Sequence, residues 1–252
     1  MAIKGDYAQI LAGLPISIFG ANVAVTQPTV KDICAFGEDK FLSQVSIFLN
    51  LDSFTEKIKE GNSQLEMLSD FQIFMTVLNE DETFSQEILN FFELIFPNYH
   101  VVLDSGCIQF QLEENGPFIG QINPMNFETF CDTLKELFIP FNADEVEYNP
   151  ANDKAKEIAE KIKQGRKKRQ KQKSDGENFS MYGIYVSCLA IGLPMDMNTL
   201  LNYTPFQLHD SFVRYNAKLS FDLYQRVATM PMMDTSSMKE PPSWLDDIYK
   251  SG

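Results

Sequence analysis

The sequence predicts an α+β fold that is mainly helical. Its 252 residues are 44% apolar and 12% aromatic, enough for a sizeable hydrophobic core. Apolar residues recur at helical spacing through most of the chain, whereas 16–26 and 99–122 are rich in β-branched residues and turn signals. We therefore expect an N-terminal hairpin and a three-stranded antiparallel meander among helices, then a basic helical connector and a small all-helical domain.

The hairpin is expected over 16–26 and stops at Gln27-Pro28. Pro28 suits the first turn of a helix, because proline fixes φ and lacks an amide hydrogen that the first turn leaves unbonded. Apolar residues over 30–48 continue this helix, and Phe36-Gly37-Glu38-Asp39 is expected to divide it into two shorter helices.

Helical periodicity returns after a polar loop at 61–63 and predicts helices over 65–78 and 83–96. The meander follows, because Ser-Gly and Asn-Gly pairs separate three short β-like runs within 99–122. A further helix is expected between Pro124 and Pro140, with one apolar face.

Charge divides the rest of the chain. Ten of the 21 lysines and arginines lie between Lys154 and Lys173 with only two glutamates, a net charge of +8, while the remaining residues carry 11 basic and 33 acidic groups, a net charge of −22. We therefore expect an α+β N-terminal domain at 1–150 and a basic helical connector at 151–177. A small helical domain at 178–230 and a flexible tail with a Trp docking motif at 231–252 would follow.

The small domain is expected to contain three helices. The stretch 179–193 is apolar on most faces and predicts a buried helix, and Asp196 or Asn198 can cap a short one. Thr204-Pro205 is a strong start for a long helix. Its residues expected to face a core are Phe206, Phe212, Tyr215, Leu219, Leu223 and Tyr224.

Catalytic and metal-binding patterns are missing from the sequence. It has two histidines and contains no Gly-rich phosphate loop, no GxSxG and no HExxH, so we expect no enzyme activity and no cofactor or metal. The four cysteines lack CxxC spacing and lie among apolar residues, which predicts buried free thiols in a reducing cytoplasm. Without a signal-peptide pattern or an apolar run of about 18 residues, the chain is expected to be soluble and intracellular.

The basic segment is open to three interpretations: a solvated connector, a docking element for acidic surfaces, or a nucleic-acid contact through Arg166, Lys167, Lys168 and Arg169. Nucleic-acid surfaces usually interleave aromatic residues with the charges, and this segment has none. The overall charge of −14 also disfavours polyanions, so nucleic-acid binding is the least favoured interpretation.

The tail carries the only Trp of the chain. Trp244, Leu245, Ile248 and Tyr249 would share one face of a short helix. Such a face either folds back onto a groove of its own protein or docks a partner by the helix-in-groove mode.

The order of these parts resembles a known family. The N-terminal stretch PISIFGANVAVTQPTVKDICAFGEDKFLSQVSIFL, the charged segment and the helix from Leu200 to Tyr215 resemble, in that order, proteins from the tail-morphogenesis modules of long-tailed phages of Gram-positive hosts. Such proteins are similar to tail assembly chaperones. The Trp-containing tail is a departure from the pattern.

This resemblance implies a non-enzymatic chaperone that binds the tape measure protein, with the tail tube protein as a second partner, in the host cytoplasm and absent from the mature virion. The alternatives are a structural virion protein at the tail or head-to-tail junction and a nucleic-acid-binding accessory protein. The residues expected to contact a partner are Phe206, Asp210, Arg214, Tyr215, Trp244, Leu245, Ile248 and Tyr249.

Overall fold

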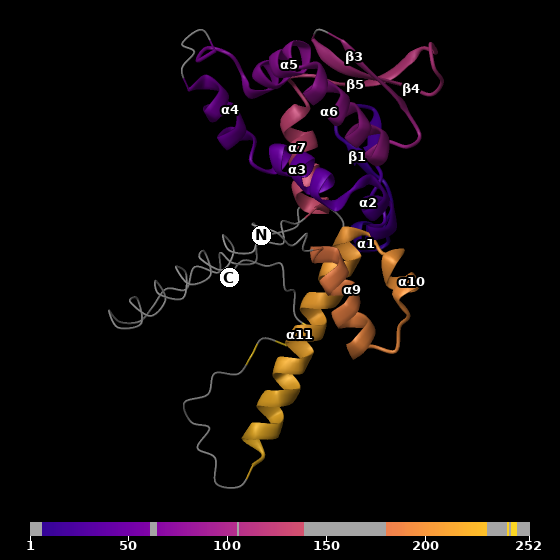
Figure 1. The fold of residues 1–252 in the computed structure, drawn as a ribbon, viewed down its shortest axis with the longest axis vertical. Helices are drawn as coiled ribbons and strands as arrows, with labels where there is room; N and C mark the ends of the chain where they lie inside the picture. The colour runs from indigo at the N-terminus through magenta and orange to yellow at the C-terminus, as the bar shows by residue number, and fades with distance from the viewer. Residues whose placement is uncertain are drawn as a thin grey trace, which may run out of the picture.

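The computed structural model describes residues 7–60, 65–104, 106–138, 180–230, 241 and 243–245. The expected loop at 61–63, the basic connector and most of the tail lie outside the described residues. Figure 1 shows the sheet and α5 at one end of the molecule and the long helix α11 projecting at the other. The mainly helical α+β fold with a hairpin and a three-stranded antiparallel sheet is confirmed.

The chain begins with helix α1 (Tyr7–Leu11) and a hairpin of β1 (Ile16–Ile18) and β2 (Val23–Val25), paired antiparallel as expected. Helices α2 (Val30–Phe36) and α3 (Glu38–Leu49) follow, divided at Gly37, whose φ is +107°. Thr29 is the N-cap of α2 in a capping box with Asp32, so Pro28 precedes the cap and does not lie in the first turn.

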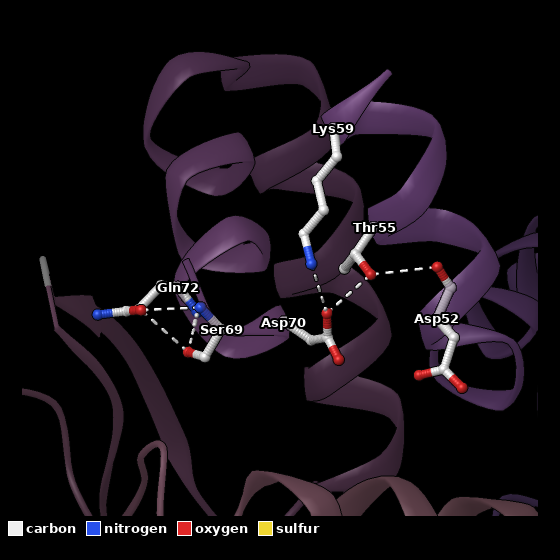
Figure 2. Close-up of polar contacts among 6 residues, drawn as sticks. All are labelled: Asp52, Thr55, Lys59, Ser69, Asp70 and Gln72. Atoms are coloured by element: carbon white, nitrogen blue, oxygen red, sulfur yellow. Dashed lines mark hydrogen bonds and ion pairs between the residues drawn. The ribbon is translucent and has the colours of Figure 1, made fainter. Parts of the chain in front are cut away.

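Helix α4 (Leu51–Lys59) was not predicted as a separate element, because only Asn50 separates it from α3. It is joined to α5 (Asp70–Glu80) by a polar contact that Figure 2 shows. The buried Thr55 hydroxyl donates to Asp70 Oδ1 at 2.8 Å, and Lys59 Nζ lies 3.6 Å from the same oxygen. The helix predicted over 65–78 starts later than expected, because Ser69 caps its first turn.

Helix α6 (Glu82–Ile95) leads into the sheet of β3 (His100–Asp104), β4 (Cys107–Gln111) and β5 (Phe118–Ile122). The strands pair antiparallel in chain order. The predicted Asn-Gly turn joins β4 to β5, and Asn115 takes the left-handed φ of +62° that Asn tolerates.

Helix α7 (Phe127–Leu137) begins after Asn126 rather than at Pro124. The Asn126 amide nitrogen donates to the carbonyls of Gly20 and Gln121, both at 3.0 Å, and so ties the hairpin turn to β5. Gly120 makes this contact possible, because a Cβ there would lie 2.3 Å from the Ala21 carbonyl oxygen.

Phenylalanines form the centre of the N-terminal core. The ring of the buried Phe48 lies 5.3–5.7 Å, centroid to centroid, from those of Phe74, Phe91 and Phe130, which belong to α5, α6 and α7. Aromatic pairs of this kind contribute about 0.5–1.5 kcal/mol each beyond the burial of apolar area. One residue of α3 therefore joins three other helices.

The C-terminal helices are α9 (Met181–Gly192), α10 (Met197–Leu201) and α11 (Pro205–Ala228). Their buried residues belong to the same hydrophobic cluster as those of the N-terminal elements. Glu38 of α3 accepts from the Met181 amide at 2.6 Å and the Ser180 hydroxyl at 2.5 Å, and the Val30 amide donates to the Tyr203 carbonyl at 2.8 Å. Residues 180–230, the described part of the small domain predicted at 178–230, thus share a core with α1 to α3.

The expected burial of the helix over 179–193 and of all four cysteines was wrong. The helix predicted over 179–193 is buried on one face only, since α9 exposes Cys188 and 87% of Ile191. All four cysteines are free thiols, but only Cys131 is buried, while Cys34 and Cys188 are exposed. An apolar sequence neighbourhood does not bury a helical residue that faces away from the core.

Replacing Gly120 with Ala is expected to destabilise the fold by about 2–3 kcal/mol, because the new methyl group would overlap the backbone of the β1–β2 turn. Gly106→Ala is the matched control, since no atom lies within 4 Å of its Cβ position. The free energy of unfolding of both variants, measured in urea, checks this. Equal stabilities would contradict the close contact.

The thiols are expected to differ in reactivity. Burial raises the pKa of the Cys131 thiol to about 12, so at pH 8 it stays protonated, and the thiolate is the reactive form. Iodoacetamide at pH 8 should therefore label the exposed Cys188 in the native protein and Cys131 only after unfolding in guanidinium chloride. Peptide mass spectrometry measures this, and equally fast labelling of both residues would disprove it.

Candidate partner-binding site

Helix α11 starts where the sequence predicted. The Gln207 amide donates to Thr204 Oγ1 at 3.3 Å and the Thr204 amide donates to Gln207 Oε1 at 2.8 Å, a complete capping box with Pro205 at the first helical position. Gln207 Nε2 also donates to the Leu11 carbonyl at 2.7 Å. The start of α11 is therefore fixed to the end of α1.

One turn further, Asp210 joins α11 to α1 through a polar cluster. Asp210 is 5% exposed, and its Oδ1 accepts from the Tyr7 hydroxyl at 2.9 Å. Arg214 Nε donates to Asp210 Oδ1 and Oδ2 at 3.2 and 3.1 Å, and Arg214 Nη2 donates to Tyr7 Oη at 3.2 Å. The Arg214 guanidinium is thus held by both Asp210 and Tyr7.

The directions of the pKa shifts in this cluster agree with these hydrogen bonds. Partial burial raises the pKa of Tyr7, which keeps its hydroxyl protonated as a donor to Asp210. Burial alone would lower the pKa of Arg214, but its bonds to Tyr7 and Asp210 raise it instead. Burial lowers the pKa of the neighbouring His209, which keeps that ring neutral near pH 7. Asp210 and Arg214 therefore form the charged pair at the base of α11.

An apolar stripe runs along α11 at spacings of four, three, four and four residues, from Leu208 to Leu223. Its first part is packed. Leu208 is fully buried, and the Phe212 ring stacks on Tyr185 of α9 with centroids 4.1 Å apart. The Tyr215 hydroxyl sits over Gly192, where a Cβ would lie 2.0 Å away.

The second part of the stripe is exposed. Leu219 is 46% and Leu223 63% exposed, so the prediction that they face the core was wrong. The reason is length, since the 12 residues of α9 span about 18 Å and the 24 residues of α11 about 36 Å. Figure 1 shows α11 continuing beyond the end of α9. Ile191, 87% exposed, adds apolar surface in the last turn of α9.

The predicted contact residues fall into different environments. Phe206 is 1% exposed and its ring packs 5.8 Å from Tyr7, and Asp210 is buried with it, so both contact α1 in this structure. Arg214 and Tyr215 are partly buried. Trp244 is half-buried, its carbonyl accepts from Arg214 Nη1 at 2.8 Å, and Leu245 is 73% exposed.

The predicted contacts Ile248 and Tyr249, and the polyanion contacts Arg166 to Arg169, lie outside the described residues. Sequence reasoning missed Tyr7, which lies 203 positions from Asp210. It also missed that the stripe of α11 is longer than its partner helix. The lengths of the two predicted helices, 179–193 against 205–230, were the available signal.

Charge is distributed unevenly over the described elements. Residues 7–138 contain 19 acidic and 5 basic side chains, whereas 180–230 contain three of each. The exposed leucines therefore lie on a locally neutral helix attached to an acidic body. This arrangement suits an apolar contact at one end and electrostatic repulsion of polyanions over the rest.

Among the described residues no group of three or more His, Cys, Asp or Glu side chains could hold a metal ion. In the same part of the chain, every helix is too short or too polar to cross a bilayer. Comparison with protein-family models, curated proteins and solved structures found no match to the chain.

The Asp210–Arg214 pair is expected to stabilise the fold more than a second ion pair of equal length and spacing on the same helix. Both Asp210–Arg214 and Asp222–Lys218 join at 3.1 Å at i,i+4 spacing, but only Asp210 is buried. Asp210→Ala should lower the free energy of unfolding by about 2–3 kcal/mol because it leaves Arg214 partly buried without its counter-ion.

Asp222→Ala is the control and should change stability by no more than about 0.5 kcal/mol, since its pair is exposed to solvent. Urea unfolding of both variants measures the difference. Similar losses would show that the cluster at Tyr7 does not anchor α11.

Proposed function

We propose that this protein is a non-enzymatic phage tail assembly chaperone that binds the tape measure protein and keeps it soluble while the tail tube assembles. The observation that carries the proposal is the exposed half of the α11 stripe, Leu219 and Leu223 beyond the end of α9. The resemblance of the N-terminal stretch and of 200–215 to tail assembly chaperones supplies the partner. The chaperone acts in the host cytoplasm and is absent from the mature virion.

The exposed stripe suits a helix as its ligand. Along its first half, α11 already accepts a helix, α9, through the Tyr185–Phe212 stack and the Gly192–Tyr215 contact. A partner helix with an apolar face would continue the same packing over Leu219 and Leu223. A tape measure protein, as a long helical chain, would offer many such faces.

The expected affinity is moderate. Covering the remaining exposed surface of the two leucines contributes about 2–3 kcal/mol, which association costs largely offset. Contact with Ile191 and with neighbouring turns of α11 adds to it. A moderate affinity suits a chaperone, because the tape measure protein must later be transferred to the tube.

The acidic body supplies the second property a chaperone needs. With 19 acidic and 5 basic side chains in residues 7–138, complexes repel one another and stay dispersed. The same charge opposes nucleic-acid binding over this part of the molecule. The exposed apolar stripe favours a protein partner over the nucleic-acid alternative.

Leu219→Asp/Leu223→Asp is expected to abolish rescue of the tape measure protein, because two carboxylates would have to be desolvated in the contact. The test is co-expression of the two proteins, followed by measurement of the soluble tape measure fraction and of co-purification. Ser220→Asp/Gln225→Asp is the matched control, which adds the same charges at exposed polar positions of the same helix segment and should retain rescue.

Circular dichroism confirms that each variant is folded. No rescue by the wild-type chain would overturn the proposed function. Rescue by the leucine double variant would instead show that the tape measure protein binds elsewhere than at the exposed leucines of α11. Stoichiometric presence of the protein in purified virions, measured by mass spectrometry, would favour the structural alternative.

A further inference from the structure

The three-stranded sheet has two edge strands, β3 and β5, and the β5 edge is covered by other elements. The Gln121 amide donates to the Ala21 carbonyl at 3.0 Å, and Asn22 Nδ2 donates to the Ile119 carbonyl. The Gln121 carbonyl accepts from Asn126 Nδ2 at 3.0 Å. The β1–β2 turn and the residue before α7 therefore bind the backbone of β5 on the side away from β4.

The β3 edge presents backbone groups in the opposite direction. Asp104 lies opposite Cys107 with two residues between them, so this pair exchanges both of its backbone hydrogen bonds. Such pairs alternate along an antiparallel ladder, so the amides and carbonyls of Val101 and Leu103 point away from β4. Among the described residues, no backbone group pairs with them on that side. The strand also contains neither proline nor lysine, the residues that often protect an edge.

We propose that β3 pairs antiparallel with β3 of a second copy of this chain, which joins two three-stranded sheets into one of six strands. The proposal goes beyond the proposed function and does not depend on it. A two-fold axis at Val102 would place Val101 of each copy opposite Leu103 of the other. Because both residues have outward-facing amides and carbonyls, the two strands would exchange four hydrogen bonds.

The side chains of β3 favour a second copy as the partner. His100 and Asp104 are exposed at the two ends of the strand, on the face of the sheet that also carries Val102. Under the two-fold axis, each His100 faces Asp104 of the other copy. An imidazole N–H can donate to a carboxylate in either protonation state, and such cross-strand pairs stabilise a sheet. Asp104 also accepts from Gln109 Nε2 at 3.2 Å, which is compatible because a carboxylate accepts several hydrogen bonds.

The same side chains select the register. Moving the two-fold axis to Val101 or Leu103 would also align outward-facing backbone groups. Those registers, however, would place His100 or Asp104 opposite the apolar Val102. The axis at Val102 pairs all five residues of β3 and puts its two polar ends together.

The dimer is expected to be weak and to leave α11 accessible. One strand of five residues from each copy makes a small contact, and the acidic bodies of the two copies repel one another. Figure 1 shows the sheet and α11 at opposite ends of the molecule, so pairing through β3 would not cover Leu219 or Leu223.

Sedimentation velocity of the full-length protein in a dilution series tests the dimer. The weight-average mass is expected to rise from that of one chain toward that of two as the concentration increases. The mass of a single chain at every concentration up to about 500 μM, where even a weak dimer is populated, would overturn the proposal. This measurement requires no variant and is independent of the rescue of the tape measure protein.

Val102→Lys should raise the dissociation constant of the dimer at least about tenfold, because two like charges would meet at the axis. Gln121→Lys is the matched control and should leave the constant unchanged. Through Gln109, Gln121 lies in register with Val102 on the same face of the sheet, but it is exposed on β5, two strands from the edge. Circular dichroism checks that both variants are folded. A dissociation constant that Val102→Lys leaves unchanged would overturn the pairing through β3.

Two further variants test the register. His100→Asp would bring carboxylates together at both ends of the paired strands, and Asp104→His would bring imidazoles together, so each variant alone should dimerise more weakly than the wild-type chain. In a mixed dimer of the two variants, both ends again pair an aspartate with a histidine. Sedimentation velocity with one variant fluorescently labelled should therefore show mixed dimers in preference to dimers of either variant. No preference for the mixed dimer would overturn the register with its axis at Val102.

Discussion

The contact between the N-terminal helices and the start of the C-terminal ones is the constraint on which the rest of the structure depends. Glu38, in the first turn of α3, accepts from the first amides of α9 and so satisfies donors that a helix start leaves unbonded. Asp210 binds Tyr7 of α1 within the first two turns of α11. Two carboxylates thus fix both long C-terminal helices on one side of the molecule.

The anchoring of both helix starts determines where α9 stops covering α11. Because the starts of α9 and α11 are both anchored to the N-terminal core, the difference in their lengths appears entirely at the far end. A stripe that is continuous in sequence is therefore buried at Leu208 and exposed at Leu223. The exposed apolar surface follows from the anchoring of both helices and from the greater length of α11, which carries the last leucines of the stripe beyond the end of α9.

Local signals in the sequence predicted most of the fold, because caps and turns depend on a few neighbouring residues. Thr204-Pro205, Asp196 and Asn115-Gly116 each marked an element boundary that the structure confirms. Burial was predicted less well, since it depends on which elements meet. The exposure of Cys188 and Leu223 could not be read from helical periodicity, and Tyr7 and Asp210 are too far apart in sequence for their contact to be foreseen.

The same constraint separates the polar side of α11 from its apolar stripe. Arg214 takes part in holding α11 to α1 and also donates to the Trp244 carbonyl. Because an α-helix turns by about 100° per residue, Asp210 and Arg214 lie on the side of α11 away from the stripe that runs from Leu208 to Leu223. The contacts that anchor α11 therefore leave Leu219 and Leu223 uncovered, and a partner could bind the exposed leucines while the anchor of the helix stays intact.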